Sequence, residues 1–171
     1  MAIGQKGVII ITTQKNLVTA NGIELELYKE FEEHMEAHAD VRFQDIIDAV
    51  SRIDYNGTFF MAPVDLGHVV GVNHLIHRPT DEKVQMLHRK GRAGVTPCVF
   101  HQVAPATTKI VVGIAHDDGK DVVFTAFYGE LSPREPWDES IQSNPELLKE
   151  SKDFWAAHAL IVTEDQIDWS K

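Results

Sequence analysis

The stretch between residues 108 and 128 constrains the fold of this chain more than any other. Two runs rich in β-branched residues, 108–116 and 121–128, flank the sequence Asp117-Asp118-Gly119. An Asp-Gly pair between runs of this kind is typical of a tight turn, because glycine takes a positive φ without steric cost. The pattern therefore predicts an antiparallel β-hairpin.

Shorter β-rich runs lie on both sides of this hairpin, and Pro, Gly and Asp residues separate them. Short runs of β-branched or aromatic residues with such boundaries are typical of strands. We expect further strands at residues 7–13, 58–62, 68–77, 83–89 and 160–163. The last of these is expected to close an edge of the sheet.

Three other stretches have helical periodicity. Apolar residues recur every four positions between 23 and 38, with glutamates around them, which predicts an acidic amphipathic helix. The same reasoning predicts a second helix over 42–53 and a C-terminal helix that begins at Pro145, since proline fits the first helical turn. Residues 132–137 should form a rigid loop, because two prolines fix its φ angles.

Together these expectations describe an α+β protein, with an antiparallel sheet, N-terminal helices and one C-terminal helix packed on the sheet. A length of 171 residues and 43% apolar residues suit one hydrophobic core. We therefore expect a single α+β domain over 1–171. Residues 1–56 supply a strand and two helices, and residues 57–171 supply a β-rich part with the C-terminal helix.

The lone cysteine and the hydropathy bear on the compartment. Cys98 can form no internal disulfide, which favours a reducing environment. The N-terminal segment shows no cleavage pattern, and no run reaches the roughly 20 apolar residues that a membrane span needs. We expect a cytoplasmic protein without a membrane partner.

Charge is distributed unevenly along the chain. The formal net charge is −10, which argues against general binding to a nucleic-acid backbone. Residues 74–109, here called the basic island, nevertheless carry six lysine and arginine side chains against two carboxylates. The basic island is the part of the chain best suited to attract a phosphate group.

The basic island also contains the side chains that metal-free RNA cleavage requires. In that reaction a histidine takes the 2′-hydroxyl proton, and a cation stabilises the charge of the transition state. The candidate residues are His74, Arg89, Lys90, Arg92, Thr96, His101 and Thr108. The alternative is a solvated sheet face without function, since strands commonly expose such side chains.

Nine histidines are present, and two of them have a spacing known from metal sites. His34 and His38 stand four apart in a predicted helix, so they would share a face. Glu36 lies between them rather than directly after the first histidine, so the zinc-protease motif is incomplete. We assign no cofactor or metal to the chain. His34 and His38 are the candidate metal pair, and the alternative is a solvated acidic helix face.

Four segments resemble a family of small uncharacterised bacterial and phage-borne proteins. They are RKGRAGVTPCVF (89–100), VAPATTKIVVGI (103–114), TAFYGELSPREPWD (125–138) and SKDFWAAHAL (151–160). The features of the resemblance are a Gly-Arg basic turn, a Pro-Trp-Asp loop and a Ser-x-x-Phe-Trp-x-x-His-Ala-Leu helix. It covers the chain from His74 onward and implies no particular activity.

In the order of its elements the chain also resembles toxin ribonucleases of the barnase, colicin and RelE type, which place N-terminal helices before an antiparallel sheet. This resemblance implies that His74 is the base and that Arg89 or Arg92 holds the phosphate. It implies that Thr108 supplies the hydroxyl group on the sheet. A shared architecture is stronger evidence for a fold than for an activity.

Two functions follow from these observations. The first is binding of RNA or another phosphate-bearing ligand at the basic island, or its metal-independent cleavage as in a ribonuclease. The alternative is a non-enzymatic inhibitor, immunity factor or phage accessory protein. In that case the acidic helices would dock onto a basic protein partner.

Overall fold

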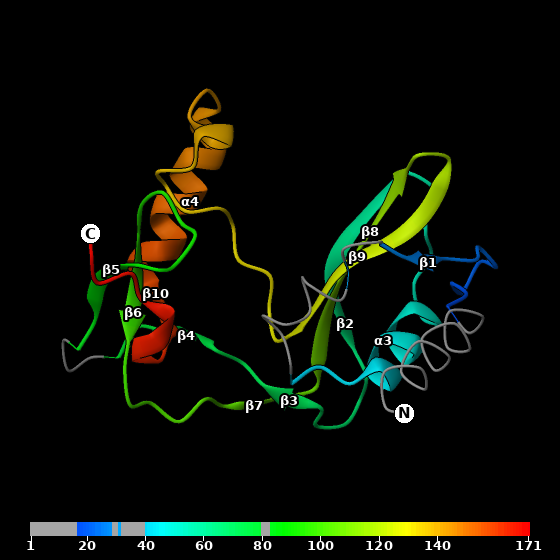
Figure 1. Cartoon of the computed structure of the whole chain (residues 1–171), viewed down its shortest axis with the longest axis horizontal. Helices are drawn as coiled ribbons and strands as arrows, with labels where there is room; N and C mark the ends of the chain where they lie inside the picture. The colour runs from blue at the N-terminus through cyan, green and yellow to red at the C-terminus, as the bar shows by residue number, and fades with distance from the viewer. Residues whose placement is uncertain (1–16, 29–30, 32–39, 80–82) are drawn as a thin grey trace. The chain divides into compact units, whose positions relative to one another are not determined.

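The computed structural model describes residues 17–28, 31, 40–79 and 83–171 (Figure 1). By its internal contacts the chain forms two compact units. Unit 1 comprises Met1–Gly71 and Ala106–Leu131, and unit 2 comprises Val72–Pro105 and Ser132–Lys171. This division does not follow the boundary between the predicted parts 1–56 and 57–171, and the single domain expected over 1–171 stays a prediction.

A four-stranded sheet forms the frame of unit 1, in the order β1-β9-β8-β2. Its strands are β1 Glu26–Leu27, β2 Phe59–Asp65, β8 Lys109–Asp117 and β9 Lys120–Tyr128. β8 and β9 are antiparallel, which confirms the predicted hairpin. In its turn Asp118 and Gly119 have φ angles of 50° and 74°, and positive φ at both central residues suits the twist of the strands.

The start of the described chain differs from the prediction. The periodicity over 23–38 predicts a helix, but β1 pairs in parallel with β9 instead, and the Leu25 N–H donates to the Leu17 carbonyl oxygen. The helix is therefore wrong for its first turns, because sheet pairing overrides local helical preference. The rest of this stretch, apart from Phe31, and the predicted strand 7–13 lie outside the described residues.

Helix α3, Phe43–Val50, confirms the helix predicted over 42–53. The helix buries one apolar face in the core of unit 1, together with side chains of β8. The buried residues of the two elements are Ile46, Ala49, Val50, Ile110, Val112 and Ile114. Periodicity of about four residues placed the helical members of this set on one face.

Tyr128, the last residue of β9, fastens α3 to the sheet. Its hydroxyl donates to Asp45 Oδ2 at 2.5 Å and accepts from the Arg42 N–H at 3.0 Å. The Arg42 guanidinium lies 3.1 Å from the same carboxylate oxygen. Asp45 is only 4% exposed, so these contacts replace the water that a carboxylate loses on burial.

Unit 2 contains a second four-stranded sheet, in the order β4-β10-β6-β5. Its strands are β4 Leu75–His77, β5 Gln85–His88, β6 Val95–Val99 and β10 His158–Ile161. β10 is antiparallel to β4 and parallel to β6. The edge position expected for the last strand is therefore wrong, since β10 lies between two other strands.

A third sheet has two short strands, β3 Gly71–Val72 and β7 Ala106–Thr107. The run 68–77 therefore contains two strands, β3 and β4, where one was predicted. The α+β class is confirmed, but the single antiparallel sheet is replaced by three sheets, of which the two larger ones are mixed. Within the described part of the chain, no helix is both long and apolar enough to cross a membrane.

Helix α4, Pro145–Ala157, begins at the predicted proline, and the Asn144 side chain accepts two N–H groups of its first turn. Arg78 caps the C-terminal end of α4. Its guanidinium donates to the Trp155 carbonyl oxygen at 2.7 Å, and its backbone N–H donates to that of Ala157 at 2.8 Å. A cation at a helix C-terminus satisfies free carbonyls and opposes their partial negative charge. Two 3-10 helices, η2 Glu139–Ile141 and η3 Glu164–Gln166, precede and follow this region.

Removal of the Tyr128 hydroxyl tests the attachment of α3. We expect Tyr128→Phe to lower the free energy of unfolding by about 1–3 kcal/mol, because buried Asp45 loses a hydrogen bond. Denaturant unfolding followed by circular dichroism measures this change. Gln44→Ala, which removes only an exposed bond to Asp48, should cost under about 0.5 kcal/mol. Equal effects of the two substitutions would contradict the role given to Tyr128.

Candidate functional site

The four residues assigned a catalytic role are divided between the two units. Thr108 belongs to unit 1, whereas His74, Arg89 and Arg92 belong to unit 2. The Thr108 hydroxyl already has a partner. The Gly67 N–H and the Thr108 hydroxyl donate to the Asp65 carboxylate and hold the pKa of Asp65 below its usual range.

Within unit 2, His74 and the arginines lie at opposite edges of the sheet. His74 immediately precedes β4, and its carbonyl oxygen accepts from the Ile161 N–H of β10. Arg89 immediately follows β5, the strand at the other edge. Three strand spacings, about 14 Å, separate these edges. The structure therefore does not bring His74 beside the arginines.

Arg89 and Arg92, in contrast, share one tight turn. The Arg92 N–H donates to the Arg89 carbonyl oxygen at 3.1 Å, and Gly91 has a φ of 77°. A positive φ at the third position of a turn favours glycine there. We call residues 89–94 the basic turn. It joins β5 to β6, and a bridge between Arg89 and Ile167 attaches it to the C-terminal segment.

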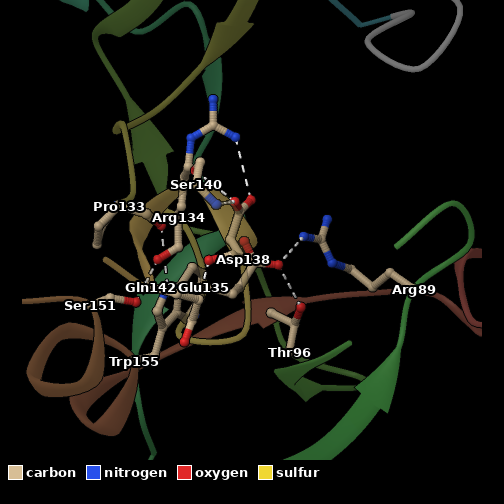
Figure 2. Close-up of polar contacts among 10 residues, drawn as sticks. All are labelled: Arg89, Thr96, Pro133, Arg134, Glu135, Asp138, Ser140, Gln142, Ser151 and Trp155. Carbon is tan, nitrogen blue, oxygen red and sulfur yellow. Dashed lines mark hydrogen bonds and ion pairs between the residues drawn. The ribbon is translucent and has the colours of Figure 1, made fainter. Parts of the chain in front are cut away.

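Glu135, in the loop that follows β9, forms an ion pair with Arg89 of the basic turn. Its side chain is 10% exposed, and its Oε2 lies 3.3 Å from Arg89 Nη2. The same oxygen accepts from the Thr96 hydroxyl at 3.0 Å. Figure 2 shows the Glu135 carboxylate between these two partners. One buried carboxylate thus joins the loop after β9 to the turn and to β6.

Arg92 and Glu135 act on the charge of Arg89 in opposite directions. Burial lowers the pKa of Arg89 below its usual range and the charge of Arg92 lowers it further, while Glu135 opposes both. Arg89 Nε is buried and has no hydrogen-bond partner among the described residues. A mostly buried guanidinium with a second guanidinium nearby is a setting that an anion would stabilise.

The loop that carries Glu135 is fixed by donors from other parts of unit 2. The Trp155 indole N–H donates to the Pro133 carbonyl oxygen at 3.2 Å, and the Ser151 hydroxyl donates to that of Arg134. The Gln142 amide donates to the carbonyl oxygen of Pro136 at 2.6 Å. Figure 2 shows these side chains converging on the loop. These hydrogen bonds hold three carbonyl groups of the loop and so position the Glu135 carboxylate.

Trp137 attaches the same loop to the end of the basic turn. Its indole N–H donates to the Val95 carbonyl oxygen at 2.8 Å. Its ring packs on Gly94, where a Cβ would come within 2.4 Å of the ring. Glycine at this position is therefore a requirement of close packing rather than of backbone conformation.

The other cations of the basic island have mostly structural partners. Arg78 caps α4, and Lys109 lies 2.9 Å from Glu130. Lys90 and Arg92 are exposed on the basic turn. Among the described residues, the Arg92 side chain has no hydrogen bond or ion pair, so its charge is available to a ligand.

Metal binding finds no support in the described residues. His34 and His38 lie outside them, and no group of three or more His, Cys, Asp or Glu side chains within them could hold an ion. His158, which belongs to the Ser-x-x-Phe-Trp-x-x-His-Ala-Leu motif, contacts Phe154. Its ring stacks on Phe154 with centroids 3.8 Å apart, and its Nδ1 lies 2.8 Å from the Phe154 carbonyl oxygen.

Sequence comparison assigns no family to this chain. No protein-family model matches it, and no curated protein matches it significantly. Among solved structures it is similar to a conserved hypothetical protein from Toxoplasma gondii ME49, with a TM-score of 0.49 and 10% sequence identity. The similarity covers 72% of this chain and 85% of that chain. The resemblance to bacterial and phage-borne proteins stays a prediction.

The reactivity of Cys98 tests whether strand β6, which carries Thr96 of this site, is buried. The thiol is fully buried on β6, and burial raises its pKa from 9.0 to about 11. The native thiol should stay protonated at pH 9, whereas the unfolded thiol is half ionised. We expect iodoacetamide to alkylate native Cys98 at least about tenfold more slowly than the denatured chain at this pH. Equal rates, followed by mass spectrometry, would show that the strand is accessible to solvent.

Proposed function

We propose that unit 2 binds a phosphate-bearing ligand at the basic turn, and that single-stranded RNA is the class of ligand. The observation that carries this proposal is the placement of Arg89, Lys90 and Arg92 on one short turn beside a single buried carboxylate. Guanidinium groups bind phosphate oxygens with two parallel hydrogen bonds. The chain as a whole has a formal net charge of −10, whereas this turn carries three cationic side chains.

Arg92 is the main contact in this proposal. Arg92 is exposed and has no partner among the described residues. Lys90 lies near Asp165, whose pKa is lowered mainly by a hydrogen bond from the Thr163 hydroxyl and to a smaller extent by the charge of Lys90. Arg89 is held by Glu135, and its side chain is 22% exposed. A phosphate between the two guanidinium groups would reduce their mutual repulsion.

An exposed tryptophan in the same unit favours RNA over a small phosphate compound. Trp169 is 61% exposed and follows Ile167, the residue that pairs with Arg89, by two positions. Its ring stacks beside Phe100 with centroids 6.2 Å apart. Proteins that bind single strands combine a cationic track for phosphates with aromatic rings on which bases stack.

The proposal is for binding rather than cleavage. General-base catalysis needs a base within hydrogen-bond reach of the reacting hydroxyl, and His74, the base that the ribonuclease resemblance implies, lies at the opposite edge of the sheet from the basic turn. The alternative of acidic helices docking onto a basic partner rests on the segments 23–38 and 42–53. Among the described residues of these two segments, Phe31 and the residues of α3 are helical.

Binding of a fluorescent single-stranded RNA, followed by anisotropy at several salt concentrations in EDTA, tests the proposal. We expect Arg92→Gln to weaken binding several-fold and to reduce the slope of log Kd against log salt by roughly 0.7, because one phosphate contact is lost. Trp169→Ala should weaken binding without changing the slope, since stacking is not ionic. The RNA should be recovered intact.

Lys152→Gln is the matched control, because it makes the same change of charge on the exposed face of α4. It should leave the affinity within about twofold of the unmodified protein. Absence of binding at the lowest salt would contradict the proposal. So would an equal loss in Arg92→Gln and Lys152→Gln, which would show that only net charge matters.

A further inference from the structure

Unit 1 has an open pocket that the RNA proposal does not use. Its volume is about 550 Å³, within the range of roughly 300–1,000 Å³ that is usual for small-molecule sites. Aromatic side chains of Tyr28, Phe59 and Phe124 line it, together with Asp117. Phe59 is 54% exposed, which is unusual for a phenylalanine that has a sheet to pack on.

A β-bulge places Phe124 in this pocket. The register between β8 and β9 shifts between Gly113 and Ile114, so Phe124 has no direct partner on β8. Its ring lies over Gly113, where a Cβ would come within 2.6 Å, and beside the Phe59 ring with centroids 6.1 Å apart. Bulges are common where a strand must redirect a side chain toward a ligand.

Asp117 supplies a carboxylate at the rim of the aromatic surface. It follows Ala115 by two residues on β8, so the two side chains leave the same face of the sheet. Ala115 pairs with Phe59 of β2, which brings that face next to the rings. Within the described ranges, the Asp117 carboxylate has no hydrogen bond or ion pair.

His116 also lines the pocket, but its ring already has a partner. His116 Nδ1 lies 2.9 Å from Asp121 Oδ1, which also accepts from the Tyr55 hydroxyl at 3.0 Å. His116 and Asp121 pair directly across the hairpin, so both lie on the face opposite Ala115 and Asp117. Asp117 is therefore the carboxylate that lines the pocket.

We infer that this pocket binds a small aromatic cation, of which an arylalkylammonium is the simplest member. Its ring would lie against Phe59 and Phe124, and its ammonium group would donate to the Asp117 carboxylate. The negative faces of the aromatic rings attract a cation, and a charge-assisted hydrogen bond fixes its orientation. The inference is independent of RNA binding, because every residue involved belongs to unit 1.

Three probes of similar shape and different charge test the inference on the full chain. They are benzylammonium, benzyl alcohol and benzoate, and amide chemical shifts in β8 and β9 report their binding. We expect benzylammonium to bind about two- to fivefold more tightly than benzyl alcohol, as one exposed ion pair allows. Benzoate should bind most weakly.

Two substitutions separate the charge from the aromatic surface. Asp117→Asn should bring benzylammonium to the affinity of benzyl alcohol and leave benzyl alcohol unchanged. Phe124→Ala should weaken both, and its thermal unfolding shows whether the variant still folds. Asp118→Asn, which removes a carboxylate from the adjacent turn, is the control and should change benzylammonium binding by less than about twofold.

Each other outcome overturns part of the inference. Equal binding of the ammonium and the alcohol would remove the role of Asp117. Absence of shifts near Phe59 and Phe124 with all three probes would show that the pocket binds no aromatic molecule. Equal losses in Asp117→Asn and Asp118→Asn would mean that the cation responds only to the general charge of the hairpin.

Discussion

The Glu135 carboxylate connects its own loop to the basic turn and to β6, whose contacting residues lie 46 and 39 positions earlier in the sequence. Its partners are Arg89 at the start of the basic turn and Thr96 on the buried strand β6. A carboxylate at this depth is stable only with such partners, because burial removes its water. The loop around Glu135 cannot relax away from them, since donors from α4 and from Gln142 hold its carbonyl groups. The conformation of the basic turn, and hence the proposed function, depends on this contact.

Elements with a local signal could be predicted from the sequence. The Asp-Gly turn identified the β8–β9 hairpin, apolar spacing identified α3, and Pro145 identified the start of α4. Each of these signals comes from neighbouring residues whose conformational preferences agree with the final structure. The position of β10 had no such signal. Its partners β4 and β6 are distant in sequence, and a parallel pair leaves no turn that could mark it.

In the candidate site, too, local contacts could be predicted from the sequence and contacts between distant strands could not. Arg89 and Arg92 lie together because a single glycine turn joins them, which the sequence shows directly. Thr108 and His74 could not be placed, because the register of the β2–β8 pair and the order of the second sheet decide where they lie. Glu135 was missed as a partner of the turn, although its position in a loop with two prolines was a signal that a fixed acidic group stands there.

The most direct measurement is the coupling free energy between Arg89 and Glu135. A double-mutant cycle with Arg89→Met, Glu135→Gln and the double variant gives this energy from denaturant unfolding. The structure predicts a coupling of about 1–3 kcal/mol, since each single change leaves a mostly buried charged or polar group without its partner. A coupling below about 0.3 kcal/mol would contradict the central claim, because the two side chains would then not fix the basic turn together.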